Sequence, residues 1–382
     1  MLKIKCDRII RNETLFDGYV YVDGNRIVRI TEEDLPADSY YDYSGKYLSA
    51  GFIELHAHGG GGFSFDDGTS EDIVNASNFH LNYGVTTILP TMACAPMPEL
   101  RRVLENIKQA KASEKLKGRI HGAHLEGPYF SPSQCGGQPA GYIYAPKKED
   151  YESLIADYGQ YITRWSYAPE KDDNGEFCKY ITSHGIIASA GHTDAKYKDM
   201  LVAMENGCNL VTHLYSCTST VTRDHGFRSL GVIETAYLTD DLYVEIIADG
   251  KHLPYDLIKM ILKIKGTDKV ALITDSLRVA GVYPNDVTVE CEDMLIEDGV
   301  CKLKDRSAFK GSIATANVLL KTLVKGCGVA IPTAVKMLTE IPARILKETS
   351  LGKICEGALA DLVVFDGDFA VSDVFVDGVK VV

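Results

Sequence analysis

Eight short apolar runs recur between residues 50 and 349, and longer segments of helical period separate most of them. Runs of this kind are typical of parallel strands joined by crossover helices. Eight such units predict an α/β fold, a closed (β/α)8 barrel of the TIM type, which can occupy about 250 residues or more. The predicted strands cover residues 52–57, 85–89, 120–125, 162–167, 186–190, 210–213, 243–248 and 270–274.

Segments of helical period and one interruption complete the predicted barrel. After the last strand, residues 287–304 alternate apolar and polar side chains, which predicts a β-hairpin insertion. Helices are predicted at residues 71–83, 98–112, 195–206 and 255–265, and three more are expected to close the barrel at 314–325, 333–339 and 342–347.

The two ends of the chain have the pattern of β-structure. An Asp-Gly-Asn turn at residues 23–25 lies between alternating runs, and Asp-Gly turns follow apolar runs near the other end. Neither end carries enough apolar residues for a core of its own. We therefore predict one small β-sandwich domain built from residues 1–49 and 350–382, beside a barrel of residues 50–349.

Composition disfavours several classes of protein. A formal net charge of −13 argues against an extended nucleic-acid surface, because phosphate backbones require an excess of lysine and arginine. No apolar run approaches the roughly 18 residues that a membrane span needs. The ten cysteines include no Cys-x-x-Cys pair, and the N-terminus lacks the apolar core of a signal peptide. These features predict a cytoplasmic protein with reduced thiols.

Side chains of metal-binding types stand at the ends of five predicted strands. In a barrel the C-terminal ends of the strands surround one site, so these side chains are expected to converge. Imidazole and carboxylate groups suit zinc, iron or manganese, and the sequence does not choose among these ions. The residues are His56 and His58 after the first strand, Glu126 after the third, His192 after the fifth, His213 at the sixth and Asp275 after the eighth.

Asp275 is the candidate general base and acid. A carboxylate beside a metal site can take a proton from water and return it to a leaving amine. Two other roles stay open for it, as a further metal ligand or as the N-cap of a helix. The glycines at 59–62 predict a tight loop at the rim of the pocket, and nothing in the sequence shows that they bind phosphate.

The motifs around these residues resemble those of one family. In their order along the chain they are similar to the motifs of the N-acetylglucosamine-6-phosphate deacetylase family of the amidohydrolase superfamily. Residues 357–364 resemble the superfamily's C-terminal return strand. The motifs are His-Leu-Glu-Gly-Pro-Tyr at 124–129, Ser-Ala-Gly-His-Thr-Asp-Ala at 189–195, Thr-His-Leu-Tyr at 212–215, Ala-Asp-Gly-Lys-His at 248–252 and Ile-Thr-Asp at 273–275.

The resemblance implies metal-dependent hydrolysis of the acetamido group of N-acetylglucosamine 6-phosphate, a linear amide, to glucosamine 6-phosphate and acetate. It assigns Glu126, His192 and His213 to the ion that activates water. His56 and His58 would hold a second ion beside Glu126, but some members of the family lack this pair. One or two divalent ions are therefore expected, zinc first, with iron or manganese as alternatives.

The same resemblance makes Asp275 the family's general base and acid and implies substrate contacts. Gln138 falls where the family has a histidine or glutamine near the substrate carbonyl, and an amide can donate a hydrogen bond to developing negative charge. Gly137, which precedes it, is a further candidate for substrate binding. Ser216 and Cys217 replace an Asn-Ala pair that contacts the phosphate in the family. Ser216 can still bond an anion, but it is shorter and lacks the amide.

Arg223 and His252 match the family's phosphate-binding arginine and histidine by neighbourhood, with Arg228 as an alternative because the register is shifted. Arginine suits phosphate through its planar fork of donors. Family members commonly form dimers in which phosphate contacts can come from the partner subunit. The resemblance therefore implies a homodimer that acts on a small-molecule amino-sugar phosphate.

Two basic departures from the family pattern bear on specificity. Phe309, Lys310 and Gly311 stand where the family has an apolar run, and Arg278 lies in a loop that is usually small and apolar. Solvent exposure is the favoured interpretation, since long basic side chains usually reach water. If either side chain faced the sugar, another N-acetyl amino-sugar phosphate, such as N-acetylgalactosamine 6-phosphate, would be the substrate.

Two other classes of function stay as alternatives. Another amidohydrolase, such as a cyclic-amide hydrolase or a dipeptidase, would often bridge two metals with a modified lysine on strand four, and residues 162–167 contain no lysine. A catalytically silent barrel kept for binding or assembly should have lost ligands, and all the candidate ligands and Asp275 are present.

Overall fold

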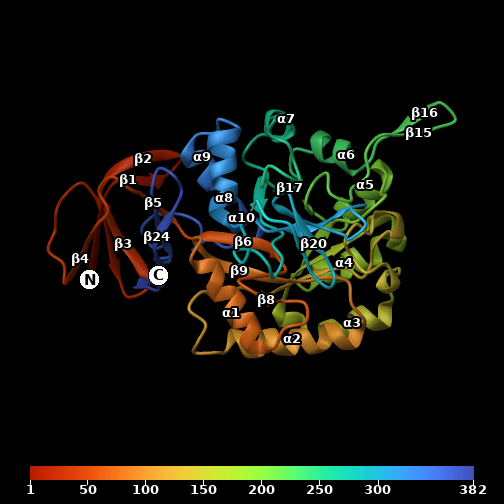
Figure 1. Cartoon of the computed structure of the whole chain (residues 1–382), viewed down its shortest axis with the longest axis horizontal. Coiled ribbons are helices and arrows are strands. Elements are labelled where there is room, and N and C mark those ends of the chain that lie inside the picture. The colour runs from red at the N-terminus through yellow and green to blue at the C-terminus, as the bar shows by residue number, and fades with distance from the viewer. Residues whose placement is uncertain (285) are drawn as a thin grey trace.

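A sheet of parallel strands forms the body of the protein, coloured from orange to blue in Figure 1. The computed structural model describes residues 1–284 and 286–382. Apart from β10, each strand pairs in parallel with the next strand of the sheet along the chain, and β10 pairs with β9 beside β11. The strands are β6 (Phe52–Ala57), β9 (Val85–Met92), β10 (Arg119–Ile120), β11 (Ala123–Glu126), β12 (Ile162–Tyr167), β13 (Ile187–Ala190), β14 (Leu210–Val211), β17 (Tyr243–Ile247) and β18 (Val270–Ile273).

The barrel closes between β18 and β6 with different contacts at its two ends. Near the C-terminal ends, the backbone N–H of Asp275 donates to the carbonyl of His56 (2.9 Å), and that of His58 donates to the carbonyl of Ser276 (2.8 Å). At the opposite end, residues 337–338 accept hydrogen bonds from both strands and fill the gap between them. The direct closure therefore lies at the end of the barrel that carries the candidate metal ligands.

Helices cover the outside of the barrel, and the first shows why they form where they do. The hydroxyl of Thr69 accepts the N–H of Asp72, and the carboxylate of Asp72 accepts the N–H of Thr69 (2.8 Å), which makes a capping box. Among the described residues, no helix is both long enough and apolar enough to cross a membrane. The helices are α1 (Ser70–Leu81), α2 (Met97–Lys111), α3 (Lys148–Tyr158), α4 (Glu176–Ser183), α5 (Tyr197–Glu205), α6 (Val232–Leu238), α7 (Tyr255–Lys265), α8 (Ala316–Lys321), α9 (Ile331–Lys336) and α10 (Glu340–Ile345).

The predicted barrel is confirmed, and three predicted elements need correction. The single strand at 120–125 is wrong, because the pairing breaks between β10 and β11 and the register of β11 against β12 shifts after Ala123. The helix predicted at 314–325 begins at Ala316 and its last turn, Thr322–Gly326, is a π-helix. The predicted hairpin is too short, because the insertion has four antiparallel strands: β19 (Val289–Glu290), β20 (Leu295–Glu297), β21 (Val300–Lys302) and β22 (Phe309–Ser312).

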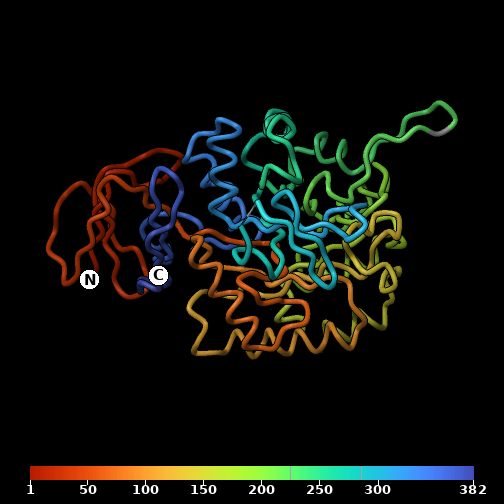
Figure 2. Tube along the Cα trace, in the orientation of Figure 1, coloured from red at the N-terminus to blue at the C-terminus, as the bar shows by residue number. Residues whose placement is uncertain are grey.

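The two ends of the chain form one small β-domain, as predicted. All eight of its strands belong to a single hydrogen-bonded sheet, in which β23 pairs antiparallel with β5 and so joins the two ends. Figure 2 shows the blue C-terminal trace against the red N-terminal one. The boundaries predicted at 49/50 and 349/350 stay a prediction. The strands are β1 (Leu2–Arg11), β2 (Thr14–Asp23), β3 (Arg26–Thr31), β4 (Ser39–Asp42), β5 (Tyr47–Ala50), β23 (Leu362–Phe365), β24 (Val371–Val376) and β25 (Val379–Lys380).

Arg119 ties the barrel to this terminal domain. From β10 its guanidinium pairs with the carboxylates of Asp361 and Asp377, the second at 2.9 Å. The side chain of Asp361 is only 4% exposed. Burial raises the pKa of Asp361 although the charge of Arg119 opposes this shift. The carboxylate of Asp361 therefore depends on Arg119 for compensation of its buried charge.

We predict that Arg119→Met lowers the free energy of unfolding by about 3 kcal/mol, because it leaves the Asp361 carboxylate buried without its cation. Urea unfolding followed by circular dichroism measures the change. The control is Arg29→Met, which removes an exposed ion pair with Glu33 and should change the stability by about 1 kcal/mol or less. Equal effects of the two substitutions would contradict the role of Arg119.

Candidate metal centre and active site

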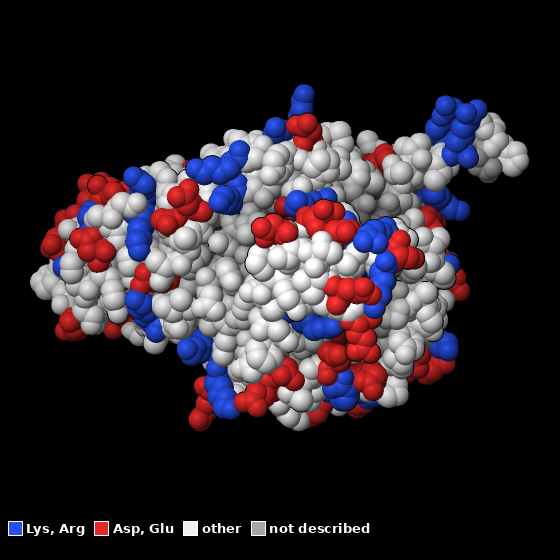
Figure 3. All heavy atoms as spheres, in the orientation of Figure 1, with Lys and Arg blue, Asp and Glu red and all other residues white. Residues whose placement is uncertain are grey.

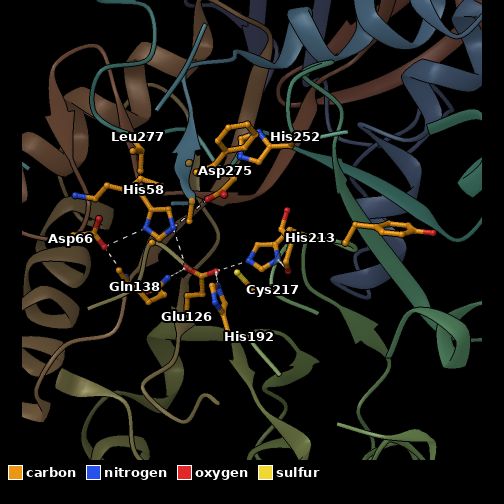
Figure 4. Close-up of a pocket in the computed structure, with 18 residues that line it drawn as sticks. His58, Asp66, Glu126, Gln138, His192, His213, Cys217, His252, Asp275 and Leu277 are labelled. Carbon is orange, nitrogen blue, oxygen red and sulfur yellow. Dashed lines mark hydrogen bonds and ion pairs between the residues drawn. The ribbon is translucent and has the colours of Figure 1, made fainter. Parts of the chain in front are cut away.

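Glu126 lies at the centre of the site, at the C-terminal end of β11 (Figure 4). Its carboxylate is almost fully buried. One oxygen, Oε1, lies 3.0 Å from Nε2 of His213 and 3.2 Å from Nε2 of His192. The other, Oε2, lies 3.2 Å from Nε2 of His58. A single carboxylate therefore faces imidazoles that follow three other strands, β6, β13 and β14.

His56 completes a second group around the same carboxylate. Its Nε2 lies 3.4 Å from Oε1 of Glu126 and 3.4 Å from Nε2 of His58. The ligand atoms of His56, His58 and Glu126 all lie within 4.8 Å of one another, and so do those of Glu126, His192 and His213. The structure thus brings together all five residues that the sequence predicts as metal ligands.

The hydrogen bonds of the rings show that this donor set fits a metal ion. Nδ1 of His192 donates to the carbonyl of Gln134 (2.8 Å), and Nδ1 of His213 donates to the carbonyl of Ser216 (3.1 Å). Because a carbonyl can only accept, each neutral ring has its lone pair on Nε2, toward Glu126. Two lone pairs and a carboxylate that face each other require a cation between them. Carbonyl-oriented imidazoles with a carboxylate are a ligand set for divalent metals.

The electrostatics of the site also favour a bound cation. Burial would raise the pKa of Glu126, but positive charge on the surrounding imidazoles, that of His56 first, holds it well below its usual range. Burial lowers the pKa of His58, but the carboxylates of Asp66 and Asp275 raise it well above its usual value. The anionic side chains therefore demand positive charge, which a divalent ion supplies while the imidazoles stay neutral.

Asp275 follows β18 and faces the His56–His58 half of the site. Its Oδ1 lies 3.4 Å from Nε2 of each of the two histidines. Burial raises its pKa, but the charge of His56 and the hydrogen bond with His58 lower it further, so the carboxylate is ionised as a base must be. No helix of the described chain begins at Asp275, so the N-cap alternative is wrong. Both the base and the ligand roles remain compatible with this position.

A pocket of about 290 Å³ lies over these residues, and Asp275 is in its wall. The predicted substrate-binding residues line it with one exception, Arg223. Tyr215 and Leu277, which the sequence did not indicate, complete part of the wall. The predicted residues that line the pocket are Gly137, Gln138, Ser216, Cys217, His252, Phe309, Lys310 and Gly311.

Gln138 is held by contacts on both sides of its amide. Its Nε2 donates to Oε2 of Glu126 (2.5 Å), and its Oε1 accepts the backbone N–H of Cys94 (2.8 Å). A Cβ on the neighbouring Gly137 would lie 2.8 Å from Cα of Lys310, so this close approach requires glycine. The amide nitrogen carries a second N–H, which can donate to a substrate carbonyl in the pocket.

Two basic side chains near the pocket, Lys310 and Arg278, are paired with the same carboxylate. Lys310 lines the pocket, and its ammonium group contacts one carboxylate oxygen of Asp293. Arg278 donates to the other oxygen (2.7 Å) and is absent from the lining of this pocket. On the same wall, Nδ1 of His252 donates to Asp249 (2.7 Å), and its ring contacts that of Phe309 edge-on at 4.9 Å. Lys310 is therefore a partly covered, paired side chain.

Arg223 and Arg228 lie on a β-arm away from the pocket of their own chain. They are paired residues of β15 (Thr222–Asp224) and β16 (Phe227–Ser229). Figure 1 shows this arm projecting from the barrel, and Figure 3 shows basic side chains gathered on it. Within one chain the predicted phosphate contact of Arg223 is not made, because the arm points outward.

Sequence reasoning missed two acidic residues that support the histidines. Asp66 lies 3.3 Å from Nδ1 of His58, and it accepts the backbone N–H of Ala93 (2.6 Å). The carboxylate of Glu54 accepts the N–H groups of His56 (3.0 Å) and Thr274 (3.1 Å), and burial raises its pKa to about 8. Alternation along β6 could have indicated Glu54, because it shares a face with His56. The position of Asp66 depends on a loop, and no pattern in the sequence indicates it.

A buried polar layer lies beneath the site. Arg164 of β12 pairs with Glu245 of β17 through its two terminal guanidinium nitrogens, and both side chains are fully buried. Arg164 also donates to the hydroxyl of Thr212 (2.8 Å). His124 bonds to the hydroxyl of Ser166 (2.7 Å), and burial and the charge of Arg164 lower its pKa well below the usual value. His124 thus belongs to the barrel interior and is outside both groups of metal ligands.

Comparison with known proteins places this geometry in a family. The model of the amidohydrolase family matches residues 47–381. The N-acetylglucosamine-6-phosphate deacetylase of Haemophilus influenzae is 30% identical over 98% of this chain and 97% of its own length. The one from Bacillus subtilis is 32% identical over 76% of each chain. The crystal structure of the Pasteurella multocida deacetylase superposes with a TM-score of 0.91 at 27% identity, over 100% of this chain and 99% of that one.

Proposed function

Because the chain belongs to the amidohydrolase family, we propose that it hydrolyses the acetamido group of N-acetylglucosamine 6-phosphate to glucosamine 6-phosphate and acetate. The observation that carries this function is the convergence of four imidazoles on the Glu126 carboxylate, with Asp275 beside them. The full-length likeness to proteins named as deacetylases of this sugar phosphate supports the substrate. A catalytically silent barrel is disfavoured, since all five candidate ligands are present and lie close together.

Each side chain of the site has a part in the proposed reaction. When bound by Glu126, His192 and His213, a divalent ion supplies Lewis acidity to the acyl carbonyl and to water. Gln138 donates its remaining amide N–H to the carbonyl oxygen as negative charge develops there. Asp275 takes a proton from the attacking water and gives it to the amine nitrogen as the C–N bond breaks. The products are a carboxylate and an amine.

In this proposal the phosphate end of the substrate lies on the side of the pocket away from Gln138. Ser216 and His252 line that side and offer a hydroxyl and a ring nitrogen. The bond from Nδ1 of His252 to Asp249 leaves Nε2 as the nitrogen that can face a ligand. Lys310 lines the same pocket, but its ammonium group is paired with Asp293, so it is not counted as a phosphate contact.

Acetate release from the gluco and galacto phosphates tests the substrate. We predict that metal-replete protein cleaves N-acetylglucosamine 6-phosphate with at least a tenfold higher kcat/KM than the galacto epimer. A tenfold ratio is about the effect of one hydrogen bond to the sugar. A preference for the galacto sugar would instead assign Lys310 or Arg278 to recognition of the sugar. Failure to release acetate from either sugar would favour the silent alternative.

The substitution Asp275→Asn tests, in the same assay, whether Asp275 is the general base and acid. The substitution preserves the shape of the side chain and removes its ability to accept a proton. We expect the metal content to stay unchanged while kcat falls by about a hundredfold or more, the usual contribution of a general acid-base. Turnover near that of the wild type would place the base elsewhere.

We also propose that the centre holds two ions, with zinc as the first candidate. Two complete ligand groups that share Glu126 support this number. We expect about two ions per chain by elemental analysis, and about one in His58→Asn, because each group needs its imidazoles to bind. His192→Asn is the matched variant of the other group, and only it should abolish acetate release. One ion per chain in both wild type and His58→Asn would contradict the second site.

A homodimer would explain why the arm that carries Arg223 points away from the pocket of its own chain. Phe227 at its tip is 80% exposed, and Leu238 of α6 and Ile264 of α7 are 64% and 50% exposed. Exposed apolar side chains that gather on neighbouring helices mark an interaction surface. A second copy that covers this surface would receive the arm and bring Arg223 to the partner's pocket, which supplies the phosphate contact that its own chain lacks.

Mixing two inactive variants tests this arrangement. If the arm acts on the partner's site, Asp275→Asn and Arg223→Met chains complement each other, because their mixed dimer contains one intact site. We expect activity of about a quarter of the wild type from random pairing in a two-fold dimer. Arg228→Met in place of Arg223→Met shows which arginine is responsible. A monomer in light scattering, with no recovery on mixing, would contradict the dimer.

A further inference from the structure

A second cavity adjoins the active-site pocket. Its volume is about 430 Å³, and it shares His58, Asp66, Gln138 and Lys310 with the wall of the pocket. The residues proposed to bind phosphate, Ser216 and His252, are absent from its wall. The cavity therefore opens onto the pocket beside His58 and Gln138, and Ser216 and His252 do not line it.

The second cavity meets the pocket on the Gln138 side of Glu126. Figure 4 shows Gln138 and Asp66 on one side of Glu126, and His213 and Cys217 on the other. An amide is planar, and its carbonyl carbon carries the amine nitrogen and the acyl carbon on different sides. When the carbonyl is at the metal centre and the sugar extends toward Ser216, the acyl carbon points toward Gln138. The second cavity continues in that direction.

The lining of the cavity indicates which groups it can hold. Apolar side chains form much of its wall, including Met92, Ala95, Val103, Met294 and Leu303. Its charged residues are four acids, Asp66, Asp67, Glu99 and Asp293, against two bases, Arg278 and Lys310.

This balance favours neutral groups. Asp293 already pairs with both Arg278 and Lys310, so no free cation of the described wall awaits an anionic acyl tail. The excess of carboxylates would repel such a tail. A neutral aliphatic chain would instead gain from contact with the apolar residues.

We propose that this cavity receives the acyl group of the substrate, and that the enzyme also hydrolyses N-acylglucosamine 6-phosphates with neutral, unbranched acyl chains longer than acetyl. This inference rests on the proposed function, since it places the same carbonyl at the same metal centre. The oxygen of water bonds to the acyl carbon, the C–N bond breaks, the amine takes the proton, and the longer carboxylate is released. At roughly the 30 Å³ that a water occupies for each carbon, an acyl chain of three to five carbons needs about 90 to 150 Å³, which is well within the volume of this cavity, about 430 Å³.

A series of synthetic substrates tests the proposal on the metal-replete protein. N-acetyl, N-propanoyl, N-butanoyl, N-pentanoyl and N-succinyl glucosamine 6-phosphate are compared by release of glucosamine 6-phosphate. We expect the propanoyl and butanoyl compounds to keep kcat/KM within about tenfold of the acetyl compound, less than the loss that a closed pocket imposes for added methylenes. The succinyl compound should be at least tenfold slower than the pentanoyl one, because its tail is anionic.

Two variants test whether the acyl chain lies in this cavity. Ala95 is half-buried, and it lines the cavity and is outside the pocket, so Ala95→Phe fills the cavity. We expect the ratio of acetyl to butanoyl activity to rise at least tenfold. Leu303→Trp fills the same space from the insertion and serves if the first variant fails to fold. Ala156→Phe, at an exposed position of α3, is the matched control and should leave the ratio unchanged.

The outcomes distinguish a failure of the acyl-cavity proposal from a failure of the proposed function. Cleavage of the acetyl compound with a loss of more than about a hundredfold for propanoyl and butanoyl overturns the acyl cavity and leaves the deacetylase function standing. Cleavage of butanoyl that neither Ala95→Phe nor Leu303→Trp reduces overturns the location. Failure of all the compounds to react overturns both proposals.

Discussion

The burial of the Glu126 carboxylate is the constraint on which the rest of the active site depends. An anion at the mouth of a barrel is costly unless positive charge or hydrogen bonds surround it. Here Gln138 supplies an N–H, and imidazoles of three strand ends lie within 3.2 Å of the two oxygens, where a divalent ion bound between them would supply the positive charge. Because both oxygens are used, Glu126 fixes how the β6, β13 and β14 ends approach one another. The same carboxylate is shared by both candidate metal groups.

The polar layer beneath the site keeps these strand ends in register. A barrel interior is usually filled by branched apolar side chains. In this barrel Arg164 and Glu245 cross the interior as a buried pair, and Glu54 bonds the backbone of the strand that ends at Asp275. Removal of one partner of such a pair leaves an uncompensated charge, so alternative packings are disfavoured. The layer thus fixes β6, β12, β17 and β18 in one arrangement below the metal ligands.

Much of this arrangement could be predicted from the sequence, because strand ends in a barrel must meet. Strand alternation and position alone bring His56, His58, Glu126, His192 and Asp275 to one rim. The residues that depend on loops could not be found in this way. Asp66 reaches His58 only through the conformation of the loop after β6, and β22 has no alternating pattern although it builds the wall of the pocket. The outward course of the arm that carries Arg223 likewise depends on tertiary packing.

Residues 216 and 217 show how the wall of the pocket can change while the backbone contacts of the candidate metal centre stay intact. The carbonyl of Ser216 accepts the Nδ1–H of His213, and the N–H of Ser216 donates to the carbonyl of His213 (2.9 Å). The carbonyl of Cys217 accepts the N–H of Thr193 (3.0 Å), next to His192. These contacts use only the backbone of residues 216 and 217. The side chain of Ser216 is therefore free to differ and to alter recognition of a ligand, because the orientation of His213 does not depend on it. The side chain of Cys217 is not free in this way, because burial lowers the pKa of His192 and the hydrogen bond with Cys217 raises it.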